Sequence, residues 1–195
     1  MGFLSRLLGG GKATRPPPEQ RQFDVIAHVA FEGAIHVIET PLGKDWQHDE
    51  DAREGEGFTV MVLKYILPAA PTPLALLAKI YTTSAGFAPP QDPALTDWHA
   101  IFGPLFAEIS GVAAQATHQT TMQGTQLPAC EAIVDGKGAD SGAPMRIRER
   151  RAVLNEEQFI LTAMGTPELF AAHADDIENW FSTAAFVPIS EAKDA

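Results

Sequence analysis

Three arginines at alternate positions are the most distinctive charged feature of this sequence. In the segment MRIRERR, Arg146, Arg148 and Arg150 share one face of an extended strand, because strand side chains alternate between two faces. Guanidinium groups bind carboxylates through paired hydrogen bonds, so the row is a candidate site for an anion or an acidic peptide. The alternative is internal pairing with glutamates on neighbouring strands. The candidates for that pairing are Glu131, Glu156 and Glu157.

Other residues that could perform chemistry do not form an active-site pattern. Cys130 is the single cysteine. It would share one apolar face of a strand with Ala132 and Val134, which favours a buried structural thiol over a nucleophile. His28 and His36 are expected to meet across a hairpin, but two ligands lack the third that a catalytic metal site needs. Phosphate-binding loops and nucleophile elbows are also absent from the sequence. We therefore predict no catalytic residue, no metal and no cofactor, and a protein that is not an enzyme.

An acidic run at residues 45–56, DWQHDEDAREGE, is a weak candidate for calcium. Counting from Asp49, the sixth residue is Glu54, where a calcium loop of the EF-hand type requires glycine. The run is therefore interpreted as a solvated loop.

Composition and charge restrict the class of partner. The chain has 195 residues, of which 45% are hydrophobic and 20% charged, as in one globular domain. Residues 1–21 contain four basic residues and one glutamate, a charge of +3, so the net charge of −11 leaves −14 on the remainder. A charge of −14 on the residues after 21 disfavours binding to nucleic acid, because nucleic acid binds clustered lysine and arginine.

The first 21 residues read as a flexible tail that is both basic and apolar, with a Gly/Pro linker at residues 9–20. Phe3, Leu4, Leu7 and Leu8 would share one face of a helix, which suggests a weak membrane or partner anchor. The alternative is a disordered terminus. No signal peptide or membrane span is recognised, so the expected location is cytoplasmic. We expect a single α+β domain over residues 22–190 and disorder over 191–195.

Periodicity predicts the elements of that domain. Residues 23–31 and 34–39 form a hairpin, 57–67 a central strand, and 71–82 fit either a helix or a strand. A helix is expected from the Asp92–Pro93 cap to Ile109, kinked at Pro104. An edge strand at 116–123, a strand at 127–136 and a hairpin of 144–154 with 157–165 follow. The result is an antiparallel sheet of about six or seven strands packed with two main helices.

The second of these helices is predicted to begin at Thr166 as the N-cap, with Pro167 as its first residue. Its inner face is apolar, and Asp175, Asp176 and Glu178 are expected to point toward water. The inner face comprises Leu169, Phe170, His173, Ile177, Trp180, Phe181 and Ala184.

Several sequence segments resemble the PsbP/DcrB-like α+β sandwich family across residues 23–187. They are Pro41, Gly43 and Trp46 where the chain leaves its first hairpin, then GTQLPACEAIVDGKG, then RRAVLNEEQFILTAMGTPELFAAHADDIENWFSTAAF. The resemblance implies an α/β/α sandwich with a binding or assembly role and no shared catalytic residues. Relatives include photosystem extrinsic subunits, a Ran-binding nuclear-import factor, bacterial lipoproteins and chaperones of type VI secretion effectors.

The resemblance therefore implies a cytoplasmic adaptor or chaperone-like bacterial protein, a secretion accessory that recognises a protein partner. Homodimerisation is left open. The alternative is a small-molecule or lipid-binding protein, or an enzyme, that uses a cleft between the sheet and the helices. A third idea is a membrane-associated accessory protein held by residues 1–8.

Overall fold

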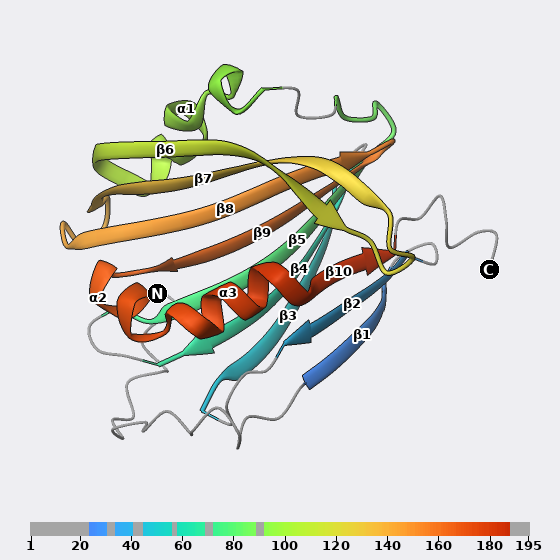
Figure 1. The fold of residues 1–195 in the computed structure, drawn as a ribbon, viewed down its shortest axis with the longest axis horizontal. Coiled ribbons are helices and arrows are strands. Elements are labelled where there is room, and N and C mark those ends of the chain that lie inside the picture. Colours follow the sequence, from blue (N-terminus) through green and yellow to red (C-terminus); the bar gives the residue numbers. More distant parts are fainter. Residues whose placement is uncertain are drawn as a thin grey trace.

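The computed structural model describes residues 24–30, 34–40, 45–55, 58–68, 72–88 and 92–187, and these form two antiparallel sheets (Figure 1). The main sheet has seven strands in the order β3-β4-β5-β9-β8-β7-β6, and the small sheet has the order β1-β2-β10. The main strands are β3 (Gln47–Gly55), β4 (Phe58–Leu67), β5 (Leu74–Thr83), β6 (Phe106–Thr120), β7 (Gln126–Gly138), β8 (Pro144–Leu154) and β9 (Glu157–Gly165). The small sheet contains β1 (Asp24–Ala30), β2 (Ala34–Thr40) and β10 (Ala184–Val187).

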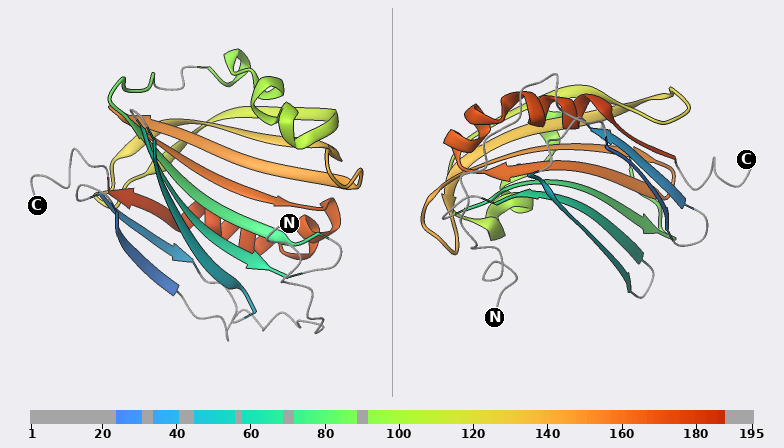
Figure 2. Two further views of the ribbon diagram at one scale, coloured as in Figure 1. Left: turned by 180° about the vertical axis from the view of Figure 1, so that it is seen from behind. Right: turned by 90° about the horizontal axis from the view of Figure 1, so that it is seen from below.

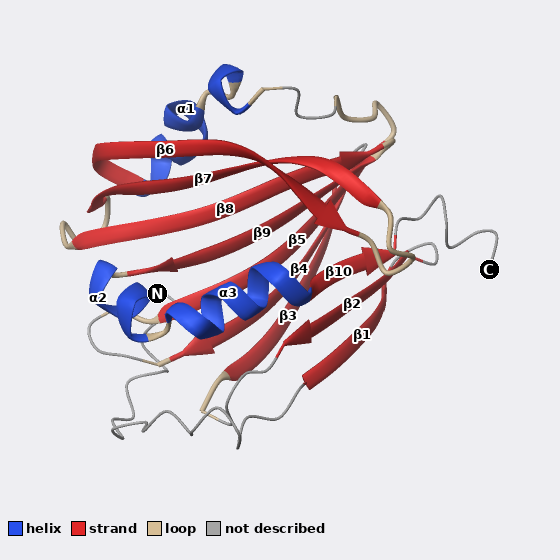
Figure 3. Ribbon diagram, viewed as in Figure 1, coloured by secondary structure: helices blue, strands red, loops and turns tan. Residues whose placement is uncertain are grey.

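Short helices complete the α+β architecture, which confirms the predicted class (Figure 3). Before β6 lie a 3₁₀ turn η4 (Pro93–Leu95), helix α1 (Trp98–Phe102) and a second 3₁₀ turn η5 (Gly103–Leu105). After β9 come α2 (Pro167–Ala172) and α3 (Ala174–Thr183). Alternation along β7 places α3 and α1 on opposite faces of the sheet (Figure 2): Ala129 packs beneath α3, whereas Cys130 packs against α1.

The locally encoded features agree with the sequence. The first hairpin is β1–β2, and the late hairpin is β8–β9. The latter turns through Asn155 with φ of 54°, a left-handed conformation that asparagine tolerates better than most residues. Thr166 caps α2, because its hydroxyl oxygen accepts a hydrogen bond from the Leu169 backbone N–H at 3.3 Å, and Pro167 follows as predicted. The ambiguous segment 71–82 is resolved as strand β5.

Residues 47–55 of the acidic run form strand β3, so the prediction of a solvated loop was wrong for them. It pairs with β4 along its whole length and forms one edge of the main sheet. A charged sequence suits such a position, because an edge strand is open to water along one side and charge discourages further pairing.

The predicted helix from Asp92 to Ile109 was also wrong beyond Phe102. Pro104 and Gly103 lie in a 3₁₀ turn, and the extended strand β6 begins at Phe106, so there is no kinked helix within residues 92–110. The helical spacing of apolar residues misled because Trp98, Phe102 and Ile109 do pack in one core cluster, but across a helix and a strand. The other two residues of that predicted stripe, Leu95 and Leu105, are exposed. The expectation of two main helices changes accordingly, since α1 has only five residues.

The terminal helix differs in two respects from its prediction. It is interrupted at His173, whose φ of −121° and ψ of 29° separate α2 from α3. Asp176 is buried rather than turned to water, with one carboxylate oxygen 3.2 Å from His173 Nδ1. Asp176 precedes Trp180 by one helical turn, so the helical spacing itself places it beside the inner face, and the expectation of a water-facing side chain followed its charge instead.

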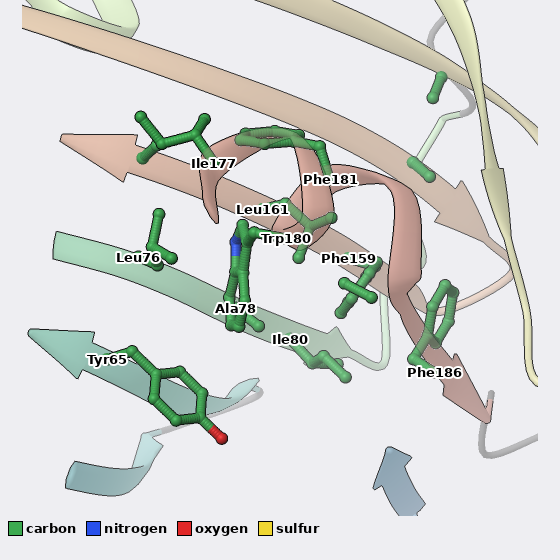
Figure 4. Packing of buried hydrophobic residues seen from close by; sticks show 14 of the residues in the cluster. Tyr65, Leu76, Ala78, Ile80, Phe159, Leu161, Ile177, Trp180, Phe181 and Phe186 are labelled. Atoms are coloured by element: carbon green, nitrogen blue, oxygen red, sulfur yellow. The ribbon is translucent and has the colours of Figure 1, made fainter. Parts of the chain in front are cut away.

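The main core fills the space between α3 and the sheet (Figure 4). Trp180 is completely buried there and meets the Tyr65 ring edge-on, with 5.5 Å between ring centroids. Figure 4 shows Trp180 pointing from α3 toward β5, among Leu76, Ala78 and Leu161.

Strand β10, which the sequence did not predict, attaches the small sheet to this core. Phe186 stacks on Phe159 with ring centroids 4.3 Å apart. Gln119 donates from its side-chain amide to the Ala184 carbonyl oxygen at 2.7 Å, and the Met122 N–H donates to the Phe186 carbonyl oxygen at 3.1 Å. The end of β6 and the turn after it therefore hold β10 in place.

Candidate functional site

The arginine row lies on β8 and points toward α2 and α3, with its charges compensated by neighbouring strand β7. Arg146 makes a paired contact with Asp135, from Nε to Oδ1 at 2.7 Å and from Nη2 to Oδ2 at 2.9 Å. Arg148 and Arg150 donate through Nε to the two carboxylate oxygens of Glu131, at 3.0 and 2.8 Å. The Glu131 side chain is only 4% exposed. Internal pairing, the alternative drawn from the sequence, is thus what the structure shows, with Glu131 as the central partner.

The same arginines also fasten the helices to the sheet. Arg148 Nη1 donates to Glu178 of α3 at 2.8 Å, and Arg150 Nη1 donates to the Phe181 carbonyl oxygen at 2.7 Å. The Arg148 guanidinium lies 4.2 Å from the centroid of the Phe181 ring. Three arginines therefore face three carboxylates, and no net positive charge is left for an external anion. Partner binding by Arg146, Arg148 and Arg150 remains a prediction that this geometry does not strengthen.

A second charged group lies on the other face of the sheet. The buried Glu149 carboxylate accepts hydrogen bonds from Arg151 Nε at 2.7 Å and from the Thr162 hydroxyl at 2.9 Å. Burial lowers the pKa of nearby Lys79, and the charge of Glu149 partly opposes that change. Alternation along the strand places Glu149 on the face opposite the arginine row, but its partner Thr162 depends on the β8–β9 register and could not be inferred from the sequence.

Cys130 is buried beside Trp98 and Ala132, as predicted. Burial raises the pKa of its thiol, which further reduces the thiolate fraction near neutral pH. This position has the properties of a packing residue rather than a nucleophile.

Alkylation of Cys130 by iodoacetamide at pH 8 should therefore be slow in the native protein. We expect the rate to be at least about a hundredfold below that of the urea-unfolded chain, because reaction requires local opening of the α1 cluster. The measurement is the time course of mass increase by mass spectrometry. Native labelling as fast as unfolded labelling would contradict the buried placement.

The remaining sequence-derived candidates contribute no further site. The register of β1 and β2 makes His28 and His36 direct backbone partners, as expected. Over the part of the chain that the structure describes, no three potential metal ligands lie together. None of the helices in that part is both long and apolar enough to cross a bilayer. The proposed anchor of Phe3, Leu4, Leu7 and Leu8 lies outside the described residues.

A surface that sequence reasoning noticed only in part is the free edge of β6. Figure 1 shows β6 at the margin of the sheet, and among the described strands it pairs in the main sheet only with β7. The predicted edge strand at 116–123 is confirmed for residues 116–120, the last part of this longer strand, whereas 121–123 lie in the turn after it. From Ile109 to Thr120 the sequence contains no Asp, Glu, Lys or Arg, whereas five of the nine residues of β3 at the opposite edge are charged. One edge thus carries the charges that discourage strand pairing, and the other does not.

Exposed apolar side chains gather around this edge. Among the residues whose exposure the structure describes, five large hydrophobic ones are exposed, and four of these flank β6 in space or in sequence. Leu95, which is 80% exposed, belongs to η4 beside β6, and Ile133, 37% exposed, lies on β7 directly opposite Ala113. The other two are Leu105 and Met122, immediately before and after the strand.

An open hollow adjoins the edge on the face that carries α3. Its floor and walls are formed by β6 and β7, and three of its six lining residues are alanines. The lining residues are Ala113, Ala114, Gln115, Glu131, Ala132 and Ile133. The hollow exists because Ala113, at the outer strand, is too small to cover Ile133 of the inner strand.

Similarity to known proteins adds no assignment to this surface. A scan of the chain against models of known protein families finds no match. A search of curated proteins finds no significant match either. The functional argument therefore rests on the uncharged free edge of β6, its exposed apolar neighbours and the hollow beside it.

Proposed function

We propose that this chain is a non-enzymatic, cytoplasmic binding protein, adaptor or chaperone-like, that recognises a protein partner through the free edge of β6. The observation that carries the proposal is an outer strand without charge from Ile109 to Thr120, which is largely exposed as far as His118 and is flanked by exposed apolar residues. Exposed apolar surface on a folded domain commonly marks an interaction site, and unpaired strand edges bind extended segments.

The finer fold assignment belongs to the same proposal. An antiparallel sheet with α3 on one face and α1 on the other is compatible with a PsbP-like α/β/α sandwich, whose relatives act by binding and assembly. The small-molecule alternative receives less support. The space between α3 and the sheet, where such a ligand would lie, is occupied by buried side chains such as Trp180 and Phe159.

Affinity capture from an extract of the native host tests the proposal. We expect the wild-type chain to recover a specific protein partner, and Ala114→Lys to recover at least about tenfold less, because charge on an edge strand opposes pairing. Ala171→Lys, the same change at an exposed position of α2, is the matched control and should capture as the wild type does.

Thermal unfolding should show that both variants remain folded, since both alanines are exposed. Equal capture by Ala114→Lys and the wild type would exclude the β6 edge as the binding surface. Failure of the wild type to recover any protein would count against a binding role altogether.

A further inference from the structure

We infer that the partner contributes an extended, uncharged segment that adds to β6 as a further strand and places one large apolar side chain in the hollow over Ala113. The inference rests on the proposed function and specifies the class of ligand. Three properties of the edge support it: its backbone, its small side chains, and its compensated charges.

The backbone of β6 offers a long template. The strand spans fifteen residues, and its irregular pairing with β7 is confined to the first part, between Phe106 and Gly111. The pairing with β7 is continuous from Val112 to Thr120, and before Gln119, which contacts β10, the opposite edge presents a regular series of backbone groups. The main chain of an added strand would form hydrogen bonds with those groups whatever its sequence. These bonds supply affinity, whereas side chains supply specificity.

Side chains on the α3 face supply the specificity. Residues Ala113 and Gln115 of β6 lie opposite Ile133 and Glu131 of β7. A side chain directly opposite Ala113 on an added strand would be about 5 Å from it and would extend over the exposed part of Ile133. Leucine, isoleucine or phenylalanine has the size and polarity to fill this space, whereas alanine leaves it empty.

The charges around the hollow argue for a neutral segment. Glu131 is already paired with Arg148 and Arg150, so neither a cation nor an anion of the ligand would find an uncompensated partner there. Burying an unpaired charge next to this group would cost several kcal/mol. The ligand therefore differs from the acidic peptide that the arginine row alone suggests.

A second copy of this chain does not fit the hollow. If β6 paired with β6 of another copy, the side chains on the α3 face would come from residues such as Ala113, Gln115 and Thr117. None of them is a large apolar residue. A segment of a different protein is therefore the occupant that the geometry favours.

Selection of a phage-displayed library of random twelve-residue peptides on the full chain tests this inference. We expect enriched sequences to contain one large apolar residue within an uncharged, strand-forming stretch. In a synthetic peptide of the enriched sequence, changing that residue to alanine should weaken binding about tenfold. The change removes three methylene-sized groups that would be roughly half buried in the complex. Binding should also protect the backbone amides of residues 112–118 from hydrogen exchange.

Two pairs of matched variants assign the effect to the site. Ala113→Leu fills the hollow from within, so it should abolish the preference for a large apolar residue, whereas Ala171→Leu should not. Ala114→Lys should prevent enrichment, whereas Ala171→Lys should not. Each leucine or lysine is introduced at an exposed alanine, and unfolding curves of all four variants identify any that fails to fold.

Several outcomes would overturn the inference. They are no enriched peptide, equal enrichment on Ala114→Lys, or an apolar preference that survives Ala113→Leu. Dimerisation of the wild type that Ala114→Lys abolishes in sedimentation would show that a second copy occupies the edge instead. If the chain still captures a host protein while no peptide binds β6, strand addition is wrong but the binding function stands.

Discussion

Replacing Glu131 with alanine is expected to lower the free energy of unfolding by about 3–5 kcal/mol, because it removes one partner of a buried ion pair. The Glu131 side chain is 4% exposed and accepts hydrogen bonds from both Arg148 and Arg150. Without it, two guanidinium groups that are at most 16% exposed lose their common counter-charge. The attachment of α3 to β8 should weaken with them, since the same arginines contact Glu178 and Phe181.

Glu178→Ala is the matched control for this measurement. Glu178 bonds to the same Arg148, at 2.8 Å, but its side chain is 66% exposed, so its removal should cost less than about 1 kcal/mol. Urea unfolding followed by tryptophan fluorescence and far-ultraviolet circular dichroism compares the two variants. Equal losses would show that Glu131 is not the centre of the arginine row.

Trp180→Ala is expected to cost about 3–5 kcal/mol of unfolding free energy, the usual range for removing a large buried aromatic residue. Trp180 is completely buried between α3 and the sheet and packs edge-on against Tyr65. The loss has two parts: the hydrophobic free energy of burying the indole, which is no longer gained, and the cost of a cavity that the surrounding strands cannot close. Calorimetric and denaturant unfolding both measure it.

Trp180→Phe should be far milder than truncation, with a loss below about 1.5 kcal/mol. The indole Nε1–H makes no hydrogen bond in the core, so phenylalanine removes an unsatisfied donor as well as some volume. The two effects oppose each other. Leu95→Ala, at an 80% exposed position, should change stability by less than about 0.5 kcal/mol. A severe loss for Trp180→Phe would mean that the indole itself, and not its packing, is required.

Features encoded by neighbouring residues could be predicted from the sequence. The cap at Thr166, the turn at Asn155 and the burial of Cys130 each depend on a few adjacent residues, and each is confirmed. The errors arise where pairing across the sheet overrides local preference. Strand β3 forms because β4 supplies hydrogen bonds along its length. The acidic run has no alternation of apolar and polar residues from which that pairing could be predicted.

The candidate site was only partly accessible to the same reasoning. Alternation correctly placed Arg146, Arg148 and Arg150 on one face, but their charge compensation depends on the β7–β8 register and on the position of α3. The threonine-rich part of β6 was correctly assigned to an edge. The exposure of Ile133 could not be inferred, because it results from the small size of Ala113 on the next strand.

The unequal edges of the main sheet have a consequence for stoichiometry. A sheet that accepts strands at both margins can propagate from molecule to molecule into an open-ended polymer. Here the charges of β3 discourage pairing at one margin, so among the described strands of the main sheet β6 is the margin open to addition. A ligand strand that occupies β6 therefore leaves no second site for growth, and the expected product is a complex of one chain with one segment.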